Sequence, residues 1–119
     1  MRSLLPKVSE VHHLLESHKI DLLGLNETWL SSSVNDHEIS APGYHILRND
    51  RNRSGGGVAV YINDTIKYER LSDIENDIVE SLWVKCSLNK TSPVIGIIYR
   101  PPNSNAQYYE SILDQIEKV

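Results

Sequence analysis

The sequence predicts a single α/β domain in which mainly one mixed or antiparallel sheet is flanked by helices. Three observations support this fold class. Apolar residues recur at helical spacing near the amino terminus, β-branched and aromatic segments follow one another through the middle, and a second amphipathic segment ends the chain. No repeat or linker interrupts the 119 residues, so we expect no domain boundary within them.

The amino-terminal third is expected to form a helix and then a buried strand. A helix over residues 7–18 would carry its apolar residues on one face, because they are spaced by three or four positions. The spacing begins at Leu4, just before the expected helix, and continues through Val8, Val11 and Leu15. Residues 20–26 form an apolar run that turns polar at its end, as a buried strand does. Residues 31–38 are polar and aperiodic, which predicts a loop.

Closely spaced strands are expected through the middle of the chain. The segments rich in β-branched and aromatic residues are 44–47, 57–62, 65–71, 78–88 and 94–99. Such short spacers between them indicate antiparallel hairpins. Ser104 and Gln107 have the spacing of a capping box, which predicts a final helix that packs back on the sheet.

Composition excludes several classes of protein. The apolar runs are too short to span a membrane, and the amino terminus lacks the hydrophobic segment of a secretory signal. We therefore expect an intracellular protein that is not secreted. Cys86 is the single cysteine, so it cannot form an internal disulfide, and its strand position predicts a small buried hydrophobe.

Charge is unevenly distributed along the chain. The formal net charge of −4 argues against a protein that coats nucleic acid. A short basic segment nevertheless contains Arg48, Arg51 and Arg53. This segment suits a local contact with phosphate, although a solvated turn explains its charge equally well.

Candidate chemistry lies at two strand ends. Glu27 follows the buried run, and a carboxylate held there suits a divalent metal, which prefers oxygen ligands. Tyr99, Arg100 and Asn103 lie at the end of another expected strand, and all three can donate hydrogen bonds to phosphate oxygens. Neither pattern is specific by itself, because an exposed acid at a strand end or a tyrosine in the core would give the same sequence pattern.

Six ordered motifs resemble the endonuclease domains of non-LTR retrotransposons. These domains belong to the endonuclease/exonuclease/phosphatase superfamily, which also contains apurinic/apyrimidinic endonucleases, sphingomyelinases and inositol polyphosphate phosphatases. The motifs are Arg2-Ser3-Leu4-Leu5-Pro6-Lys7, Leu25-Asn26-Glu27-Thr28-Trp29-Leu30, Pro42-Gly43-Tyr44, Gly55-Gly56-Gly57-Val58-Ala59-Val60-Tyr61, Glu80-Ser81-Leu82-Trp83-Val84 and Ile98-Tyr99-Arg100-Pro101-Pro102-Asn103. The resemblance implies an α/β sandwich of two packed sheets with flanking helices.

The resemblance also implies roles for particular residues. Glu27 matches the family's metal-ligating glutamate, which holds Mg²⁺ or Mn²⁺, and Tyr99 matches a tyrosine that positions the scissile phosphate. Asn103 lies in the same motif and is expected to support catalysis. The four arginines 48, 51, 53 and 100 are expected to bind the DNA substrate, with Arg48, Arg51 and Arg53 on a hairpin loop away from the chemistry. Gly55, Gly56 and Gly57 are expected to serve the turn, because no P-loop lysine follows them.

Departures from the family pattern predict that residues 1–119 are a partial domain. The resemblance implies a first strand ending in asparagine, and later Gly-Asp-Phe-Asn and Ser-Asp-His motifs that supply the general base, and none of these occurs here. We therefore expect the first strand and the carboxyl-terminal half to be missing, and this chain alone to be inactive. Without a second sheet, the inner face of the strands would expose its apolar residues to water.

Taken with its family resemblance, the sequence predicts the amino-terminal half of a Mg²⁺-dependent endonuclease that nicks DNA in the nucleus. A reverse transcriptase domain in the same full-length polypeptide and DNA as substrate are the implied partners, and no membrane partner is expected. Two alternatives stay open. One is a non-catalytic remnant or binding module, and the other is a different phosphodiesterase or phosphatase of the same superfamily.

Overall fold

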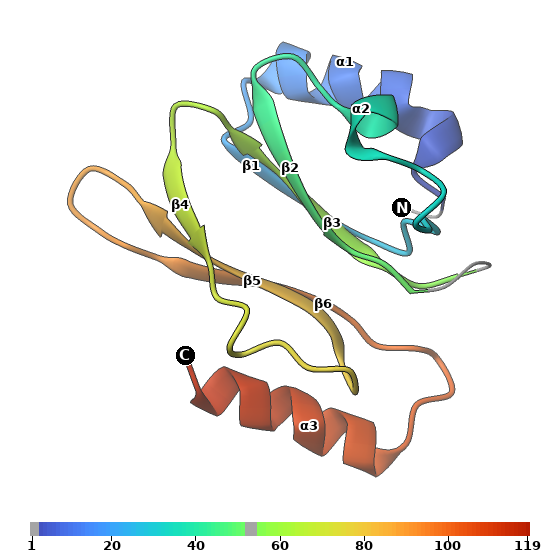
Figure 1. The fold of residues 1–119 in the computed structure, drawn as a ribbon. Helices are drawn as coiled ribbons and strands as arrows, with labels where there is room; N and C mark the ends of the chain where they lie inside the picture. Colours follow the sequence, from blue (N-terminus) through green and yellow to red (C-terminus); the bar gives the residue numbers. More distant parts are fainter. Residues whose placement is uncertain (1–2, 52–54) are drawn as a thin grey trace.

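The chain forms a four-layered arrangement of helices and two sheets (Figure 1). The computed structural model describes residues 3–51 and 55–119. The elements within these ranges are η1 (Leu5–Lys7), α1 (Val8–His18), β1 (Leu22–Asn26), α2 (Asp36–Ile39), β2 (Tyr44–Asn49), β3 (Val58–Asn63), β4 (Lys67–Arg70), β5 (Glu80–Ser87), β6 (Val94–Tyr99) and α3 (Ala106–Glu117). None of the helices in these ranges has the length and apolar character needed to cross a bilayer. The predicted α/β class is confirmed.

The strands form two antiparallel sheets of three strands each, with the orders β1-β3-β2 and β4-β5-β6. The expectation of mainly one sheet is therefore wrong. So is the expected hairpin between 57–62 and 65–71, because the chain changes sheets between β3 and β4. The Asn63 side chain turns the backbone there: its Oδ1 accepts hydrogen bonds from the Thr65 N–H at 3.0 Å and the Thr65 hydroxyl at 2.8 Å.

The two sheets bury a shared apolar core between their facing surfaces. Its fully or nearly fully buried side chains come mainly from the two central strands, β3 and β5. They are Val58, Val60, Ile62, Leu82, Val84, Cys86 and Tyr99. The expected exposure of the inner face is therefore wrong, because each sheet covers the other. The predicted burial of Cys86 is confirmed at 2% exposure, and this burial raises the pKa of its thiol.

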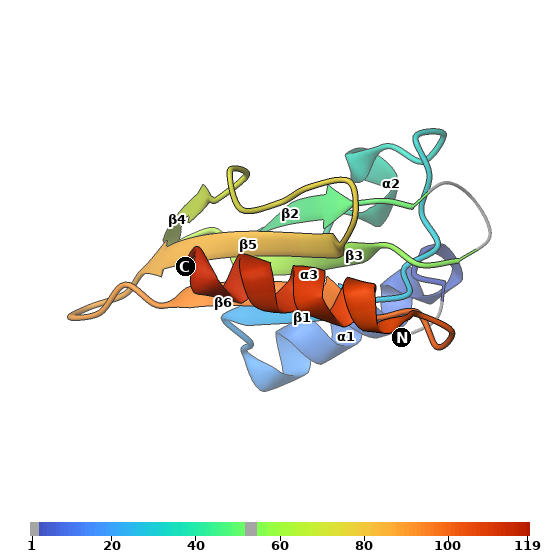
Figure 2. The same ribbon diagram turned by 90° about the horizontal axis from the view of Figure 1, so that it is seen from below.

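Helices cover the outer face of each sheet. Above β1-β3-β2, α1 and α2 enclose a second core that contains Val11, Leu15, Ile39 and Tyr61. On the other side, α3 runs along β5 and β6 (Figure 2). Its fully buried Gln115 accepts hydrogen bonds from the Ser81 hydroxyl at 2.7 Å and the Trp83 indole at 3.0 Å, which joins this helix to β5.

One helix cap differs from the expected one, and one short helix was not expected. The cap of α3 is Asn105, not Ser104, because Asn105 Oδ1 accepts the hydrogen bond from the Tyr108 N–H at 3.0 Å. The segment 31–38, expected to be a loop throughout, contains the start of the short helix α2. Asn35 and Glu38 form its capping box, in which each side chain accepts a hydrogen bond from the backbone of the other.

Tyr61 makes the stability of the second core, beneath α1 and α2, sensitive to alkaline pH. Its fully buried hydroxyl donates to the Ile39 carbonyl oxygen at 2.5 Å, and burial raises its pKa to about 12. The pKa of an unfolded tyrosine is about 10, so the unfolded chain loses this proton first as pH rises. Between about pH 10 and 12 the titration of Tyr61 should lower the free energy of unfolding by about 1.4 kcal/mol per pH unit, and it contributes no change below that range.

Urea unfolding of the wild type and Tyr61→Phe from pH 8 to 12 measures this effect. The phenylalanine variant should lose about 1 kcal/mol at pH 8 from the missing hydrogen bond, but its stability should decline less steeply above pH 10. Identical slopes in the two proteins would contradict the assignment of the alkaline effect to Tyr61.

Candidate active site

Glu27 and Tyr99 meet at the ends of two strands from different sheets. Glu27 follows β1, Tyr99 is the last residue of β6, and the Tyr99 hydroxyl donates to Glu27 Oε1 at 3.0 Å. The strands approach closely at Gly24, where a Cβ atom would lie 2.8 Å from Ile97 Cγ1. A glycine on β1 therefore permits the packing that brings the predicted carboxylate and phenol together.

The backbone that carries Glu27 is strained. Glu27 and Trp29 have φ angles of +55° and +56°, in the left-handed region that costs a non-glycine residue about 1–2 kcal/mol. Neighbouring segments hold this conformation: the Ser3 N–H donates to the Glu27 carbonyl at 2.7 Å, and the Trp29 N–H donates to the Gly56 carbonyl at 3.0 Å. The half-buried Glu27 side chain is thus presented from a fixed loop, as residues at functional sites often are.

Tyr99 is a hydrogen-bond donor at neutral pH. It is 9% exposed, and burial is the largest cause that raises the pKa of its phenol, followed by its hydrogen bond to Glu27. The Arg51 guanidinium lies 5.5 Å from the ring centroid and lowers this pKa by a smaller amount. Because the pKa lies above its ordinary value of about 10, the phenol keeps its proton and cannot act as a base near pH 7.

Glu80 joins the glycine-rich loop, which contains Gly55, Gly56 and Gly57, to the pair formed by Glu27 and Tyr99. One of its oxygens accepts the Gly57 N–H at 2.7 Å, and the other pairs with the Arg51 guanidinium at 2.9 Å. The ion pair raises the pKa of Arg51. Glu80 lies directly opposite Tyr99 in the β5–β6 ladder. Sequence reasoning missed Glu80 as a site residue, although the register of the expected hairpin between 78–88 and 94–99 was the signal that could have placed it.

A comparison with models of protein families matches residues 2–118 to the endonuclease/exonuclease/phosphatase family. The chain belongs to this family. Its members include hydrolases that act on phosphodiester bonds, and they generally use divalent metals. The superfamily predicted from the sequence motifs is thereby confirmed, whereas the retrotransposon origin stays a prediction. No curated protein matches the chain.

Arg48 does not lie on the hairpin loop, where it was expected. It belongs to β2, and its 13% exposed side chain pairs with Asp50 at 2.7 Å and Asp36 at 3.1 Å. It also donates to the Ser31 carbonyl at 2.9 Å. The hydrogen bond to Asp50 is the largest cause that raises the pKa of Arg48. Arg53, the third predicted arginine, lies outside the described residues.

The structure brings Arg51 into the site but leaves Arg100 and Asn103 beside it. Arg51 was expected on a loop away from the chemistry, yet it lies over the Tyr99 ring. Arg100 is exposed, and its Nε donates to the Ser104 hydroxyl at 3.1 Å. Asn103 occupies the exposed turn that connects β6 to α3. The catalytic role predicted for Asn103 and the substrate-binding role predicted for Arg100 stay predictions.

The residues present can supply one of the carboxylate ligands that a divalent-metal site of this family uses. Glu27 is half-buried, and its Oε1 accepts the Tyr99 hydrogen bond. The described ranges contain no cluster of three or more His, Cys, Asp or Glu side chains that could hold a metal. Mg²⁺ commonly binds one or two carboxylates and completes its coordination with water and substrate phosphate, so Glu27 can contribute one ligand.

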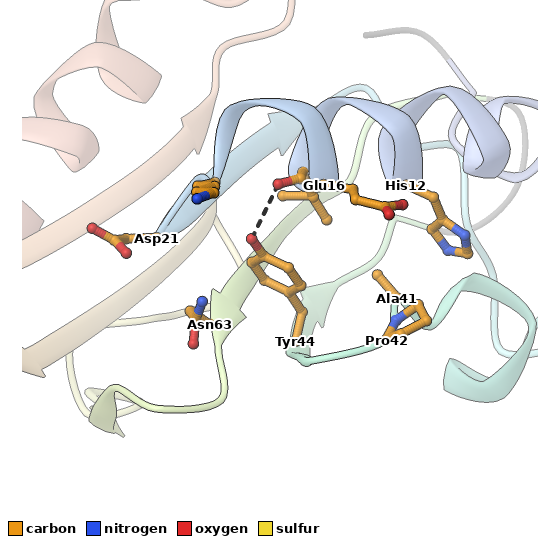
Figure 3. A pocket seen from close by; sticks show the side chains of 9 residues that line it. His12, Glu16, Asp21, Ala41, Pro42, Tyr44 and Asn63 are labelled. Carbon is orange, nitrogen blue, oxygen red and sulfur yellow. Dashed lines mark hydrogen bonds between the residues drawn. The ribbon is translucent and has the colours of Figure 1, made fainter.

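A pocket of about 670 Å³ lies beside Asp21, the residue that precedes β1, and neither Glu27 nor Tyr99 lines it (Figure 3). Its lining includes Tyr44 and His12, and both side chains contact backbone carbonyl oxygens. The Tyr44 hydroxyl contacts the carbonyl oxygens of Ile20 at 2.5 Å and Leu15 at 3.4 Å, and His12 Nε2 lies 2.6 Å from the Ser40 carbonyl. These bonds tie α1 to the segments around β2 and account for both side chains as structural contacts.

Proposed function

We propose that residues 1–119 are the amino-terminal part of a Mg²⁺-dependent DNA endonuclease from a non-LTR retrotransposon. The observation that carries the proposal is the hydrogen bond between Tyr99 and Glu27, two motif residues 72 positions apart. Family membership supports hydrolysis of a phosphodiester, and the Glu27-Thr28-Trp29-Leu30 and Tyr99-Arg100-Pro101-Pro102-Asn103 forms support the retrotransposon assignment. A reverse transcriptase domain in the same polypeptide and action in the nucleus belong to this proposal.

Each side chain of the site has a separate role in binding a phosphodiester. Glu27 would hold Mg²⁺ or Mn²⁺, which when bound neutralises phosphate charge and acts as a Lewis acid. Tyr99 keeps its proton and can turn its O–H from Glu27 toward a phosphate oxygen, stabilising the charge that develops there. Arg51 and Arg100 supply further charge-assisted donors to the DNA backbone. Activation of the attacking water is assigned to the family's Ser-Asp-His motif, outside these residues.

Nicking of supercoiled plasmid in Mg²⁺ tests this function. Purified residues 1–119 should not nick, because Glu27 alone cannot both hold the metal and activate water. The longest reading frame that contains residues 1–119 should nick the same plasmid and should leave inositol phosphates and phospholipids intact. Nicking by residues 1–119 that disappears in Glu27→Ala would contradict the proposal that the group that activates water lies outside these residues.

The same assays separate the two alternatives. Hydrolysis of inositol phosphates or phospholipids without plasmid nicking would instead identify another phosphatase or phosphodiesterase of the family. A full reading frame with no metal affinity and no hydrolysis of any of these substrates would identify a non-catalytic remnant.

A further inference from the structure

Glu80 makes three contacts that converge on the loop beside Tyr99. Its carboxylate accepts the Gly57 N–H at 2.7 Å and the Arg51 Nε–H at 3.0 Å, and it pairs with a second nitrogen of Arg51 at 2.9 Å. The Glu80 side chain is 20% exposed, whereas that of Arg51 is 42% exposed. Glu80 is therefore the anchored partner and Arg51 the accessible one.

The backbone of Glu80 is fixed to the same strand end. Its N–H donates to the Tyr108 hydroxyl at 3.0 Å, and that hydroxyl in turn donates to the Tyr99 carbonyl at 2.7 Å. Glu80 and Tyr99 are also direct partners in the β5–β6 ladder. These bonds fix the root of the Glu80 side chain relative to Tyr99, so the position of the carboxylate determines where Arg51 is held.

We infer that Glu80 is a positioning residue that holds Arg51 over the Tyr99 ring and releases it to the substrate phosphate. Only the release step of this inference rests on the proposed function. An ion pair this exposed contributes little net stability, and both Arg51 nitrogens meet a single Glu80 oxygen. A phosphate, which can bind a guanidinium in bidentate fashion, can therefore replace the carboxylate. Arg51 is then delivered to the phosphodiester next to the Tyr99 hydroxyl, without a search among rotamers.

The first test uses the ring signals of Tyr99 in the full chain of residues 1–119. Tyrosine rings are labelled with ¹³C, and Tyr99→Phe assigns the signal by NMR at fixed neutral pH. Glu80→Gln should shift the Tyr99 ring signal in the same direction as Arg51→Gln, because both remove the guanidinium from the ring face. A Tyr99 signal that stays at its wild-type position in folded Glu80→Gln would overturn the inference.

Glu75 offers a matched control. Its carboxylate also combines an arginine partner, Arg70 at 2.8 Å, with a backbone N–H, that of Trp83 at 3.1 Å. Glu75→Gln therefore removes the same type of ion pair, one that joins the connection between β4 and β5 to Arg70 and involves neither Glu27 nor Tyr99. It should lower the stability by an amount similar to that of Glu80→Gln and leave the Tyr99 ring signal unchanged. A merely structural role of Glu80 predicts no difference between the two variants.

The second test measures the release step by binding of a short DNA duplex at low salt. Glu80→Gln should tighten binding by up to about five-fold, the equivalent of breaking one exposed ion pair. In an Arg51→Gln background the same substitution should have no effect, whereas a general loss of negative charge would tighten binding in both backgrounds. Tightening in both backgrounds would overturn the release step. If no form binds DNA, the proposed function fails for this chain, and the ring signals still decide the positioning role.

Discussion

Glu27→Gln is expected to lower the rate of DNA nicking by at least about 10²- to 10³-fold in the longest reading frame that contains residues 1–119. The substitution removes the negative charge proposed to hold the metal. It keeps an oxygen that can accept the Tyr99 hydrogen bond, so the 3.0 Å contact and the strained loop around it should survive. Stability should therefore change by less than about 1 kcal/mol, and the loss should be in kcat.

The rate is measured on supercoiled plasmid at saturating Mg²⁺, with urea unfolding of the same proteins. Glu16→Gln is the control, because Glu16 lines the pocket near the residue before β1 and has no part in the proposed site. That variant should nick at the wild-type rate. An unchanged rate in Glu27→Gln would remove the metal-ligand assignment, and an unfolded variant would show that Glu27 serves the loop and not the chemistry.

Gly57→Ala should destabilise the protein by about 2–4 kcal/mol and reduce nicking at the same time. Gly57 has a φ angle of +87°, which costs alanine about 1 kcal/mol. A Cβ atom there would also lie 2.6 Å from Thr28 Oγ1, and Thr28 is 1% exposed. Because the buried threonine cannot move away, about 1–3 kcal/mol more is lost to overpacking. The displaced Thr28 would carry the adjacent Glu27 with it.

Gly43→Ala separates backbone strain from this collision. Gly43 has a similar φ angle of +81°, but a Cβ atom there would meet no atom within 4 Å. The alanine variant should lose only the strain energy, about 1 kcal/mol, and keep full nicking activity. Urea unfolding and plasmid nicking on both variants provide the comparison. Equal losses in the two proteins would contradict the proposed role of the Thr28 contact.

Local patterns in the sequence were enough to predict most of the secondary structure. The helix expected over 7–18 is α1, and the strand expected over 94–99 coincides with β6. Periodicity reports these elements because it reflects which face of each segment is buried. The short helix α2 was missed because four residues are too few to show a period, although Asn35 and Glu38 carried its capping signal.

The motifs identified Glu27 and Tyr99, but they did not show how the two side chains would be related. Each was only a residue at a strand end until the contact between β1 and β6 placed the carboxylate 3.0 Å from the phenol. Arg48 and Arg51 were equivalent in the sequence. Packing gave Arg48 two aspartate partners, Asp50 directly after β2 and Asp36 in α2. It gave Arg51 a position over the Tyr99 ring.

The sequence by itself therefore determined the superfamily and the α/β class, and it predicted two residues, Glu27 and Tyr99, that the structure places in contact. Only the tertiary structure decided that the strands divide into two sheets, that these sheets cover each other, and that Glu80 joins the glycine-rich loop to Tyr99. The physical reason is the range of the interactions. Helical periods, caps and motifs depend on residues a few positions apart, whereas sheet stacking and ladder register depend on packing between segments that are distant in the chain.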